Sequence, residues 1–435
     1  MRKWTLALLL SLALLCVPLG GQAEGAGLST NAGTSPDAVS SPTDTAPPEL
    51  DLSPTAAPEA TPAPQSLPPV SDAPLLESSP LHLKCAAALL MEADSGQIIF
   101  QMNADSPRPV ASVTKVMTIL LTLEQLDAGR VSAEDVVTVS ESAAGMGGSQ
   151  VLLDVGEQQN IGTLLKTMIV GSANDAAVAL AETLYGSEAL CAEAMNRRAE
   201  ELGMANTHFV NCTGLPADGQ HTTARDVAVM SRQMFAHARY FDYSTVWMED
   251  IDHGDGRVTQ LVNTNKLLKL YDGCDGGKTG STNEAGYCVS ATAQRGGMRL
   301  IAVVLGAASG KERFAIAQQM LDYGFANYRQ YPVAKRGTKV RGQLPVTGGK
   351  RDGVSLVLDG DLTLLVNKGD EQRVQLSPSL PESVAAPIDA GDVVGHVDVN
   401  VDGRGVAQIP IVAGDSVEAR GLPLRRIWEN WVGRF

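Results

Sequence analysis

The stretch Ser112-Val113-Thr114-Lys115 opens an apolar run that continues to Leu126. Two prolines interrupt the chain just before it, so the pattern predicts a helix that begins at the serine. Side chains three residues apart lie on one face of a helix, which would bring the Lys115 amine to the Ser112 hydroxyl. The stretch therefore pairs a nucleophile with a base at the start of a helix.

Two further motifs follow this stretch along the chain. They are Ser172-Ala173-Asn174 and Lys278-Thr279-Gly280. Each motif alone recurs by chance in a chain of 435 residues. The three together, in this order, are typical of a site for serine acyl transfer. Their hydroxyls, amines and amide suit a substrate that has a carbonyl group and a terminal carboxylate.

The residue types suggest how such a site would work. Lys115 can act as a base only when it is neutral, and burial together with the like charge of Lys278 would lower its pKa. The backbone N–H groups of Ser112 and Ser281 would form an oxyanion hole, because Gly280 has no side chain to obstruct an acyl group.

The remaining motif residues would handle the leaving group and the substrate ends. Ser172 can pass a proton to the leaving amine. Asn174 can hold the substrate amide or orient Lys115, and the sequence leaves both roles open. The Lys278 ammonium and the Thr279 hydroxyl would bind the terminal carboxylate of the substrate.

The N-terminal segment resembles a secretory signal. Met1-Arg2-Lys3 precedes a nearly apolar run, Leu6–Val17, and small residues follow at 21–23. We expect a signal peptide over residues 1–23; the alternative is a retained N-terminal anchor. Its removal changes the formal net charge from −15 to −17, which argues against nucleic acid as a partner.

Composition divides the rest of the chain. Residues 24–80 contain twelve prolines, eight acidic residues and no Lys or Arg, which predicts a disordered linker. Such a linker would allow the folded domains to reach across a cell wall or surface layer; the alternative is a low-complexity insert without a function. Residues 81–330 would form the catalytic domain. In this domain a predicted hairpin comes first, helices follow, and paired strands and a last helix come at the end. We therefore expect an α+β fold in which the N-terminal and C-terminal segments of the domain share one antiparallel sheet.

Residues 331–415 alternate apolar and polar positions between turns, which predicts a small all-β domain without a catalytic group. Residues 416–435 have the pattern of an amphipathic helix, whose apolar arc holds Leu424, Ile427, Trp428, Trp431, Val432 and Phe435. We expect residues 421–435 to lie on a membrane surface; the alternative is a helix that caps the β domain.

Five cysteines would remain after processing: Cys85, Cys191, Cys212, Cys274 and Cys288. An odd number without a CxxC pair indicates neither a disulfide framework nor a zinc site. We therefore expect no metal and no cofactor. Cys274 and Cys288 flank the third motif and can lie close together, although buried apolar thiols are the simpler interpretation.

With these motifs in place, the sequence resembles the low-molecular-weight penicillin-binding proteins that are serine-type D-alanyl-D-alanine carboxypeptidases with a C-terminal β domain. The resemblance covers about residues 84–330. Beyond the three motifs it rests on Asn174-Asp175-Ala176, Met195-Asn196, Leu202-Gly203-Met204, Thr207-His208-Phe209-Val210-Asn211, Gly214-Leu215, His221-Thr222-Thr223-Ala224-Arg225-Asp226, Asn263-Thr264-Asn265 and Asp275-Gly276-Gly277.

The resemblance implies a penicillin-recognising, β-lactamase-like catalytic domain that removes the terminal D-alanine from peptidoglycan stem pentapeptides. Ser112 would be the acylated nucleophile, which β-lactams also capture, and Lys115 the general base. Ser172, Asn174 and Lys278 would complete the site. Some members carry a histidine where this chain has Ser281, and the chain lacks a clear equivalent of the Glu-bearing loop of class A β-lactamases, so slow release of β-lactams is expected.

Two other functions use the same features. One is a β-lactamase or esterase with the same nucleophile. The other is a non-catalytic wall scaffold, which would need neither Lys115 nor Lys278.

Overall fold

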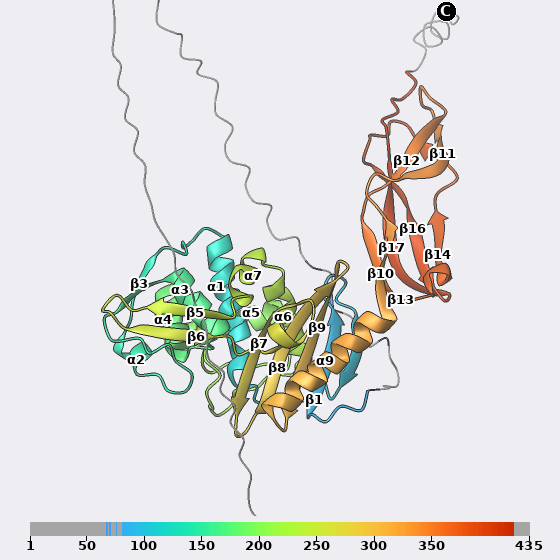
Figure 1. Cartoon of the computed structure of the whole chain (residues 1–435). Helices are drawn as coiled ribbons and strands as arrows, with labels where there is room; N and C mark the ends of the chain where they lie inside the picture. The colour runs from blue at the N-terminus through green and yellow to red at the C-terminus, as the bar shows by residue number, and fades with distance from the viewer. Residues whose placement is uncertain (1–66, 68, 71–74, 76–80, 422–435) are drawn as a thin grey trace, which may run out of the picture. The chain divides into compact units, whose positions relative to one another are not determined.

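The computed structural model describes residues 67, 69–70, 75 and 81–421 (Figure 1). The predicted signal peptide, most of the predicted linker and residues 422–435 lie outside these residues. Two residues of the predicted linker segment contact the catalytic domain: the Leu75 N–H donates to the carbonyl of Ile98 at 2.9 Å, and Val70 packs against the apolar core.

The catalytic domain is built on a five-stranded antiparallel sheet with the strand order β2-β1-β9-β8-β7. The strands are β1 (Ala87–Glu92), β2 (Ile98–Met102), β7 (Cys274–Thr282), β8 (Gly286–Arg295) and β9 (Met298–Ala307). The first hairpin and the last three strands share one sheet, so the predicted arrangement is confirmed. The strand with the third motif, β7, lies at an edge.

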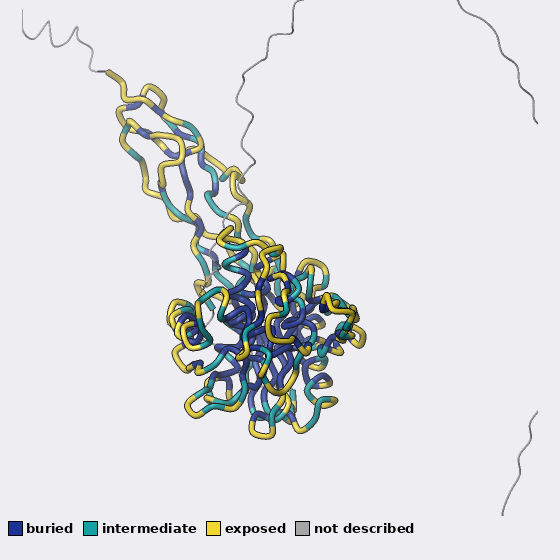
Figure 2. The backbone as a smooth tube through the Cα atoms, turned by 90° about the vertical axis from the view of Figure 1, so that its left-hand side faces the viewer, coloured by how far each residue is buried: buried dark blue, intermediate teal, exposed yellow. Residues whose placement is uncertain are grey.

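Both faces of this sheet carry buried side chains, and the interior of the catalytic domain is dark blue in Figure 2. In β9, Leu300, Ala302 and Val304 pack in one core with the helix α9 (Gly310–Asn327). The alternate side chains Ile301, Val303 and Leu305 pack in a second core with the remaining helices. A continuous apolar run from 300 to 305 is what a strand between two helical layers requires, because successive side chains point to opposite faces.

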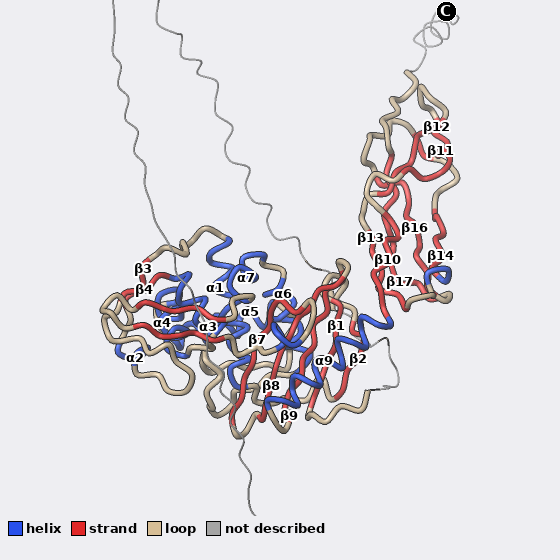
Figure 3. The backbone as a smooth tube through the Cα atoms, in the orientation of Figure 1, coloured by secondary structure: helices blue, strands red, loops and turns tan. Residues whose placement is uncertain are grey.

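Several helices form the second layer and are drawn in blue in Figure 3. They are η1 (Ala111–Thr114), α1 (Lys115–Asp127), α2 (Glu141–Ala144), α3 (Ile161–Val170), α4 (Asn174–Tyr185), α5 (Glu188–Glu201), α6 (Ala224–Phe235) and α7 (Ala238–Ser244). The short helix α8 (Leu267–Leu270) packs instead through Leu267 in the core that contains α9. Side-chain caps fix several helix starts: the Thr223 hydroxyl, for example, accepts the Asp226 N–H at 3.0 Å at the start of α6. The sequence did not predict α2, α7 and α8.

The first motif differs in one respect from its prediction. Ser112 lies in the 3₁₀ turn η1, and the regular helix α1 begins only at Lys115. Two small hairpins were also not predicted, namely β3 (Val136–Thr138) with β4 (Gln158–Asn160), and β5 (Met248–Asp252) with β6 (Val258–Val262).

The C-terminal domain is all-β, as predicted. It contains a sheet of order β14-β16-β17-β12-β11-β15 and a pair β10-β13. The strands are β10 (Tyr328–Ala334), β11 (Lys339–Thr347), β12 (Gly353–Leu358), β13 (Leu362–Asn367), β14 (Val374–Ser379), β15 (Val384–Ala385), β16 (Val393–Val401) and β17 (Arg404–Ala413). Val399 and Ile411 are fully buried in its own apolar core.

The end of this domain extends further than the predicted boundary at residue 415. Val417 exchanges backbone hydrogen bonds with Ile388 at 2.8 and 3.0 Å, and Ala419 bridges Gly349. The prediction that residues 416–421 belong to the terminal helix is therefore wrong: they pair with the β domain. The Val417 side chain is buried in the core of this domain, which holds the segment there. The rest of the predicted helix lies outside the described residues.

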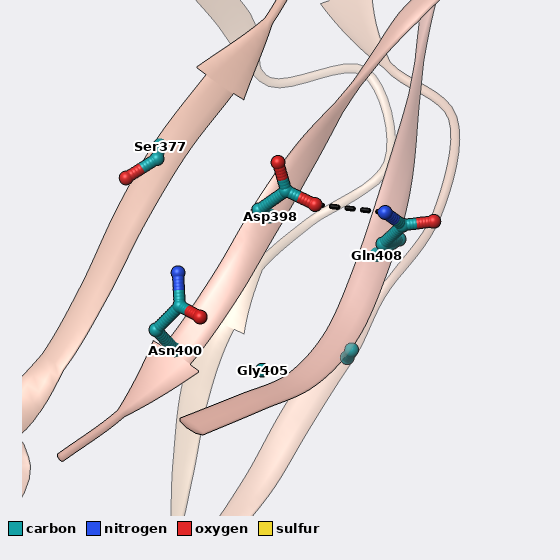
Figure 4. A pocket seen from close by; sticks show the side chains of 6 residues that line it. Ser377, Asp398, Asn400, Gly405 and Gln408 are labelled. Carbon is teal, nitrogen blue, oxygen red and sulfur yellow. Dashed lines mark hydrogen bonds between the residues drawn. The ribbon is translucent and has the colours of Figure 1, made fainter. Parts of the chain in front are cut away.

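A cavity of about 570 Å³ in the β domain is lined by polar groups of β14, β16 and β17 (Figure 4). The Gln408 amide donates to the Asp398 carboxylate at 2.8 Å, and Ser377 and Asn400 lie beside this pair. These groups offer no activated nucleophile.

Within residues 81–421, every helix is too short or too polar to cross a bilayer. The five cysteines of this part of the chain are free thiols. Burial raises the pKa of several of them, and that of the Cys191 thiol reaches about 12. The buried thiols behave as small apolar side chains.

Candidate functional site

Ser112 is held in place by two glycines. Gly214 has a φ of +81°, and a Cβ there would lie 2.0 Å from the Ala111 carbonyl oxygen. A Cβ on Gly280 would lie 2.8 Å from the backbone nitrogens of both Ser112 and Val113. Only glycine permits these two approaches. The 3₁₀ turn with the serine is thereby packed between the edge strand β7 and the loop that contains Gly214.

Lys115 lies at the centre of the site and is fully buried. Its Nζ is 3.1 Å from the Ser112 Oγ, 2.5 Å from the Asn174 Oδ1 and 2.6 Å from the Thr213 carbonyl oxygen. Two of these partners are carbonyl oxygens, which can only accept hydrogen bonds. A neutral amine has two N–H groups for these oxygens, and its lone pair is then left for the serine hydroxyl.

Electrostatics favour this neutral form. Burial lowers the pKa of Lys115 from 10.5 to about 7, although the nearby Cys212, Asp175 and Glu188 act in the opposite direction. Burial is therefore the cause that outweighs the others. From the sequence we expected the charge of Lys278 to lower the pKa of Lys115 as well, but burial is the cause that lowers it in the structure.

The second motif lies between α3 and α4. Ser172 has a φ of +64°, an uncommon value for a residue with a side chain. The Asn174 amide donates to the Gly147 carbonyl at 2.6 Å while its Oδ1 contacts Lys115. Of its two possible roles, the structure thus places Asn174 on the lysine.

The buried carboxylate of Asp175, the residue after Asn174, connects this motif to a neighbouring loop. Asp175 accepts backbone N–H groups of Val151, Leu152 and Leu153 at distances of 2.9 to 3.2 Å. It also lies in the first turn of α4, where the helix dipole favours a negative charge. The loop that contains Gly147 is thereby tied to the start of α4.

The third motif faces the second. The Lys278 Nζ lies 2.7 Å from the Ser172 Oγ and 2.8 Å from the Thr279 carbonyl. Burial, and then the positive charges of Lys115 and Arg313, lower the pKa of Lys278 well below its ordinary value. The Thr279 hydroxyl lies 2.9 Å from that of Thr264. Three hydroxyls and one amine therefore meet on this side of the serine.

Arg313, near the start of α9, contacts the same edge strand. Its Nη1 donates to the carbonyls of Gly280 at 3.1 Å and Cys288 at 3.3 Å. Its Nε is buried and finds no hydrogen-bond partner among the described residues. A guanidinium is thereby fixed against the peptide that joins Gly280 to Ser281.

The structure brings the predicted site residues together. Hydrogen bonds link Ser112, Lys115 and Asn174 in one group and Ser172, Lys278 and Thr279 in another, and Gly280 packs on Ser112. Ser281, the next residue along β7, is exposed. His221 lies outside both groups, and its Nδ1 is 2.8 Å from the Gly219 carbonyl.

Sequence reasoning missed Thr213, Thr264, Asp175 and Arg313 as parts of this site. Thr213 contributes a backbone carbonyl, so its side chain gave no signal. Arg313 is a single cation in a helix and follows no local pattern. Thr264 and Asp175 stand in segments that carry the family resemblance, which is the signal that could have identified them.

Comparisons with known proteins agree with this geometry. A family model described as D-alanyl-D-alanine carboxypeptidase, Peptidase S11, matches residues 75–309. A second model, described as Penicillin-binding protein 5, C-terminal domain, matches residues 328–419. The two matches correspond to the catalytic and the all-β domain.

Curated relatives cover most of the chain. The D-alanyl-D-alanine carboxypeptidase DacF of Bacillus subtilis is 36% identical, over 81% of this chain and 92% of its own. The D-alanyl-D-alanine carboxypeptidase DacC of Escherichia coli is 33% identical, over 80% of this chain and 88% of its own.

Solved structures share the fold. Penicillin binding protein 5 from Haemophilus influenzae aligns with a TM-score of 0.70 and 30% identity, over 78% of this chain and 99% of its own. Penicillin-Binding Protein D2 from Listeria monocytogenes, in its ampicillin-bound form, aligns with a TM-score of 0.51 and 31% identity over 57% of this chain and 100% of its own. The predicted family is confirmed: the chain belongs to the peptidase S11 family of D-alanyl-D-alanine carboxypeptidases.

Proposed function

We propose that this protein is a serine-type D-alanyl-D-alanine carboxypeptidase, a hydrolase that removes the terminal D-alanine of peptidoglycan stem pentapeptides and is acylated by penicillins. The observation that carries the proposal is the buried Lys115 amine. Two carbonyl oxygens take its N–H groups, so its lone pair is available to the Ser112 hydroxyl. The family and its relatives support the substrate.

Acylation follows from these positions. Lys115 takes the proton of the Ser112 hydroxyl, and the Oγ attacks the carbonyl carbon of the penultimate D-alanine. The backbone N–H groups of Ser112 and Ser281 stabilise the oxyanion. The C–N bond then breaks. Ser172 passes its proton to the departing D-alanine amine and receives in exchange the proton that Lys115 took from Ser112, so that Lys115 is neutral again.

The substrate ends are held by the third motif. The Thr279 hydroxyl and the Lys278 amine bind the terminal carboxylate, and the Thr264 hydroxyl supports the threonine. Deacylation needs a water molecule, which Lys115 can deprotonate in the same way. Hydrolysis of the ester regenerates the Ser112 hydroxyl and releases the shortened peptide.

The reaction is tested with residues 24–435 and a peptide that ends in D-Ala-D-Ala. We expect free D-alanine from the wild type and none from Ser112→Ala, because that variant has no hydroxyl to acylate. Mass spectrometry should detect a penicilloyl adduct on the wild type only. Absence of D-alanine release would contradict the proposal, and rapid nitrocefin turnover would favour a β-lactamase.

The pH dependence tests the role of Lys115. Because its pKa is about 7, kcat/KM should rise with pH through neutrality as the amine loses its proton. The Glu188 carboxylate raises this pKa, so Glu188→Gln should move the rise to lower pH. Glu193→Gln, on the exposed face of α5, is the control and should leave the profile unchanged. A rise moved to higher pH in Glu188→Gln would exclude this role.

Arg313 is proposed as a positioning residue for the oxyanion hole. The Gly280 carbonyl and the Ser281 N–H belong to one planar trans peptide and point in opposite directions. By fixing the carbonyl, the guanidinium directs the N–H away from α9, and it strengthens the N–H as a donor by polarising the peptide.

Replacing Arg313 tests this idea. Arg313→Met should lower kcat by about tenfold to a hundredfold with little change in KM, because an oxyanion exists only in the transition state. Arg313→Lys should recover part of the rate. Lys311→Met, an exposed neighbour, serves as the control. An increase in KM without loss of kcat would show that Arg313 serves substrate binding instead.

The location of the protein is also proposed. The N-terminal apolar run supports export, and the pattern of residues 421–435 supports attachment to the outer surface of the membrane. Deletion of residues 421–435 should abolish co-sedimentation with anionic liposomes while D-alanine release persists. Unchanged binding of the truncated protein would show that the segment is no anchor.

A further inference from the structure

The cavity of about 570 Å³ in the C-terminal domain has no part in acyl transfer. It lies over β14, β16 and β17 (Figure 4). The strand register puts Ser377, Asp398 and Gln408 side by side in one row across these three strands. Val399 and Ile409, which alternate with them along the strands, are buried in the apolar core of the domain. The row of polar side chains therefore lies on the solvent side of the sheet.

Further polar residues continue this row in both directions. On one side, Gln375 lies opposite Asn400, which in turn lies opposite Gly405. On the other side, the His396 Nε2 is 3.4 Å from the Asp398 Oδ1. Neighbouring strands lie about 4.8 Å apart, so hydrogen-bonding groups follow one another at short and regular intervals. Together these residues form the polar face of the domain.

The polar face is hollowed at its centre because small residues, Gly405 and Ala407, line the cavity there. A Cβ on Gly405 would meet only the Asn400 Oδ1, at 3.6 Å. Across residues 81–421, the Ser377 hydroxyl and the Asn400 amide form no hydrogen bond with another protein group. Both groups are therefore available to a ligand that occupies the cavity.

The residue types of this face are unusual for a strand that meets only water. Asp and Asn are among the least favourable residues in strands, yet β16 contains Asp398 and Asn400 and pairs with a strand on each side. The exposed positions of β11, in the same domain, instead include the long cations Lys339 and Arg341. Short side chains lose less conformational entropy than long ones when a ligand fixes them. The composition thus favours binding over solvation alone.

The charges of the cavity limit the class of ligand. Of the described residues that line it, Asp398 is the one carboxylate, and none is Lys or Arg. A phosphate group would lack a cation to pair with, and the net charge of −15 disfavours polyanions. An apolar ligand would leave the amides and the carboxylate without hydrogen bonds. An uncharged ligand with many hydroxyl and amide groups fits these conditions.

We infer that the polar face binds a chain of uncharged N-acetylated amino sugars, which is the chemistry of the glycan strands that carry peptidoglycan stem peptides. Asp398 accepts hydrogen bonds from sugar hydroxyls, and the amides of Asn400 and Gln408 both donate and accept. Because the two domains belong to one chain, binding here raises the effective concentration of stem peptides attached to the same glycan. The binding itself does not depend on the proposed carboxypeptidase function.

The test uses residues 24–435 and glycans without peptides, so that the catalytic site contributes nothing to binding. The probes are a soluble N-acetylglucosamine oligosaccharide, measured by titration calorimetry, and insoluble chitin, measured by co-sedimentation. We expect the wild type to bind both probes and to ignore polyphosphate.

The variants assign the binding to the polar face. Asn400→Ala combined with Gln408→Ala should weaken binding by about tenfold, because at least two hydrogen bonds are lost. Asp398→Asn should keep most of the affinity, since an amide oxygen still accepts a hydroxyl. Asn367→Ala, which removes an exposed amide on β13 of the same domain, is the matched control and should bind as the wild type does. Unchanged unfolding temperatures would show that the variants are folded.

Three outcomes would overturn this inference. They are no binding of the wild type to either probe, equal binding by the wild type and the double variant, and a loss in Asp398→Asn as large as in the double variant, which would assign the face to a cationic ligand. Absence of D-alanine release from a soluble D-Ala-D-Ala peptide, with glycan binding intact, would count against the proposed function alone.

Discussion

The site depends on one buried amine. Lys115 must be neutral to act as a base, and the protein achieves this by removing it from water rather than by surrounding it with like charge. A buried amine without partners would be costly, so its N–H groups need acceptors. Asn174 and the Thr213 carbonyl provide them. These two partners come from segments far apart in the sequence. The need for them therefore ties together α1, the start of α4 and the loop between α5 and α6.

The glycines extend the same constraint to the sheet. Gly280 allows β7 to contact the turn that contains Ser112. Gly214, in the loop after Thr213, allows that loop to contact Ala111, the residue before Ser112. A serine, its base and an edge strand are thereby brought together by backbone contacts. This packing leaves little freedom for the residues that touch substrate, which is the preorganisation that acyl transfer needs.

Much of the architecture could be predicted from the sequence because its signals are local. The apolar run from Ser112 to Leu126, the order of hairpin, helices and strands in residues 81–330, and the alternation over residues 331–415 each depend on neighbouring residues. The 3₁₀ turn at Ser112 could not be predicted, because it results from contacts with Gly214 and Gly280. The hairpin β5–β6 is partly exposed and has no strong alternation. The end of the β domain was misplaced because Val417 pairs with Ile388, a contact between distant residues.

The same distinction holds for the site. Motif residues with reactive side chains could be identified, whereas a backbone carbonyl at Thr213 and a lone cation at Arg313 could not. Arg313 acts on a peptide group whose position depends on the fold of β7.

The edge strand β7 has a further consequence. An open edge can pair with any extended chain, and natural sheets guard against such aggregation. Here the strand is irregular toward its ends: its register with β8 shifts between Cys274 and Gly276, Gly277 has a φ of +142°, and the chain turns back after Thr282. Only a few residues of edge remain. They are enough for the end of a short peptide and too few for a second sheet, so the enzyme can stay open to substrate without polymerising through that edge.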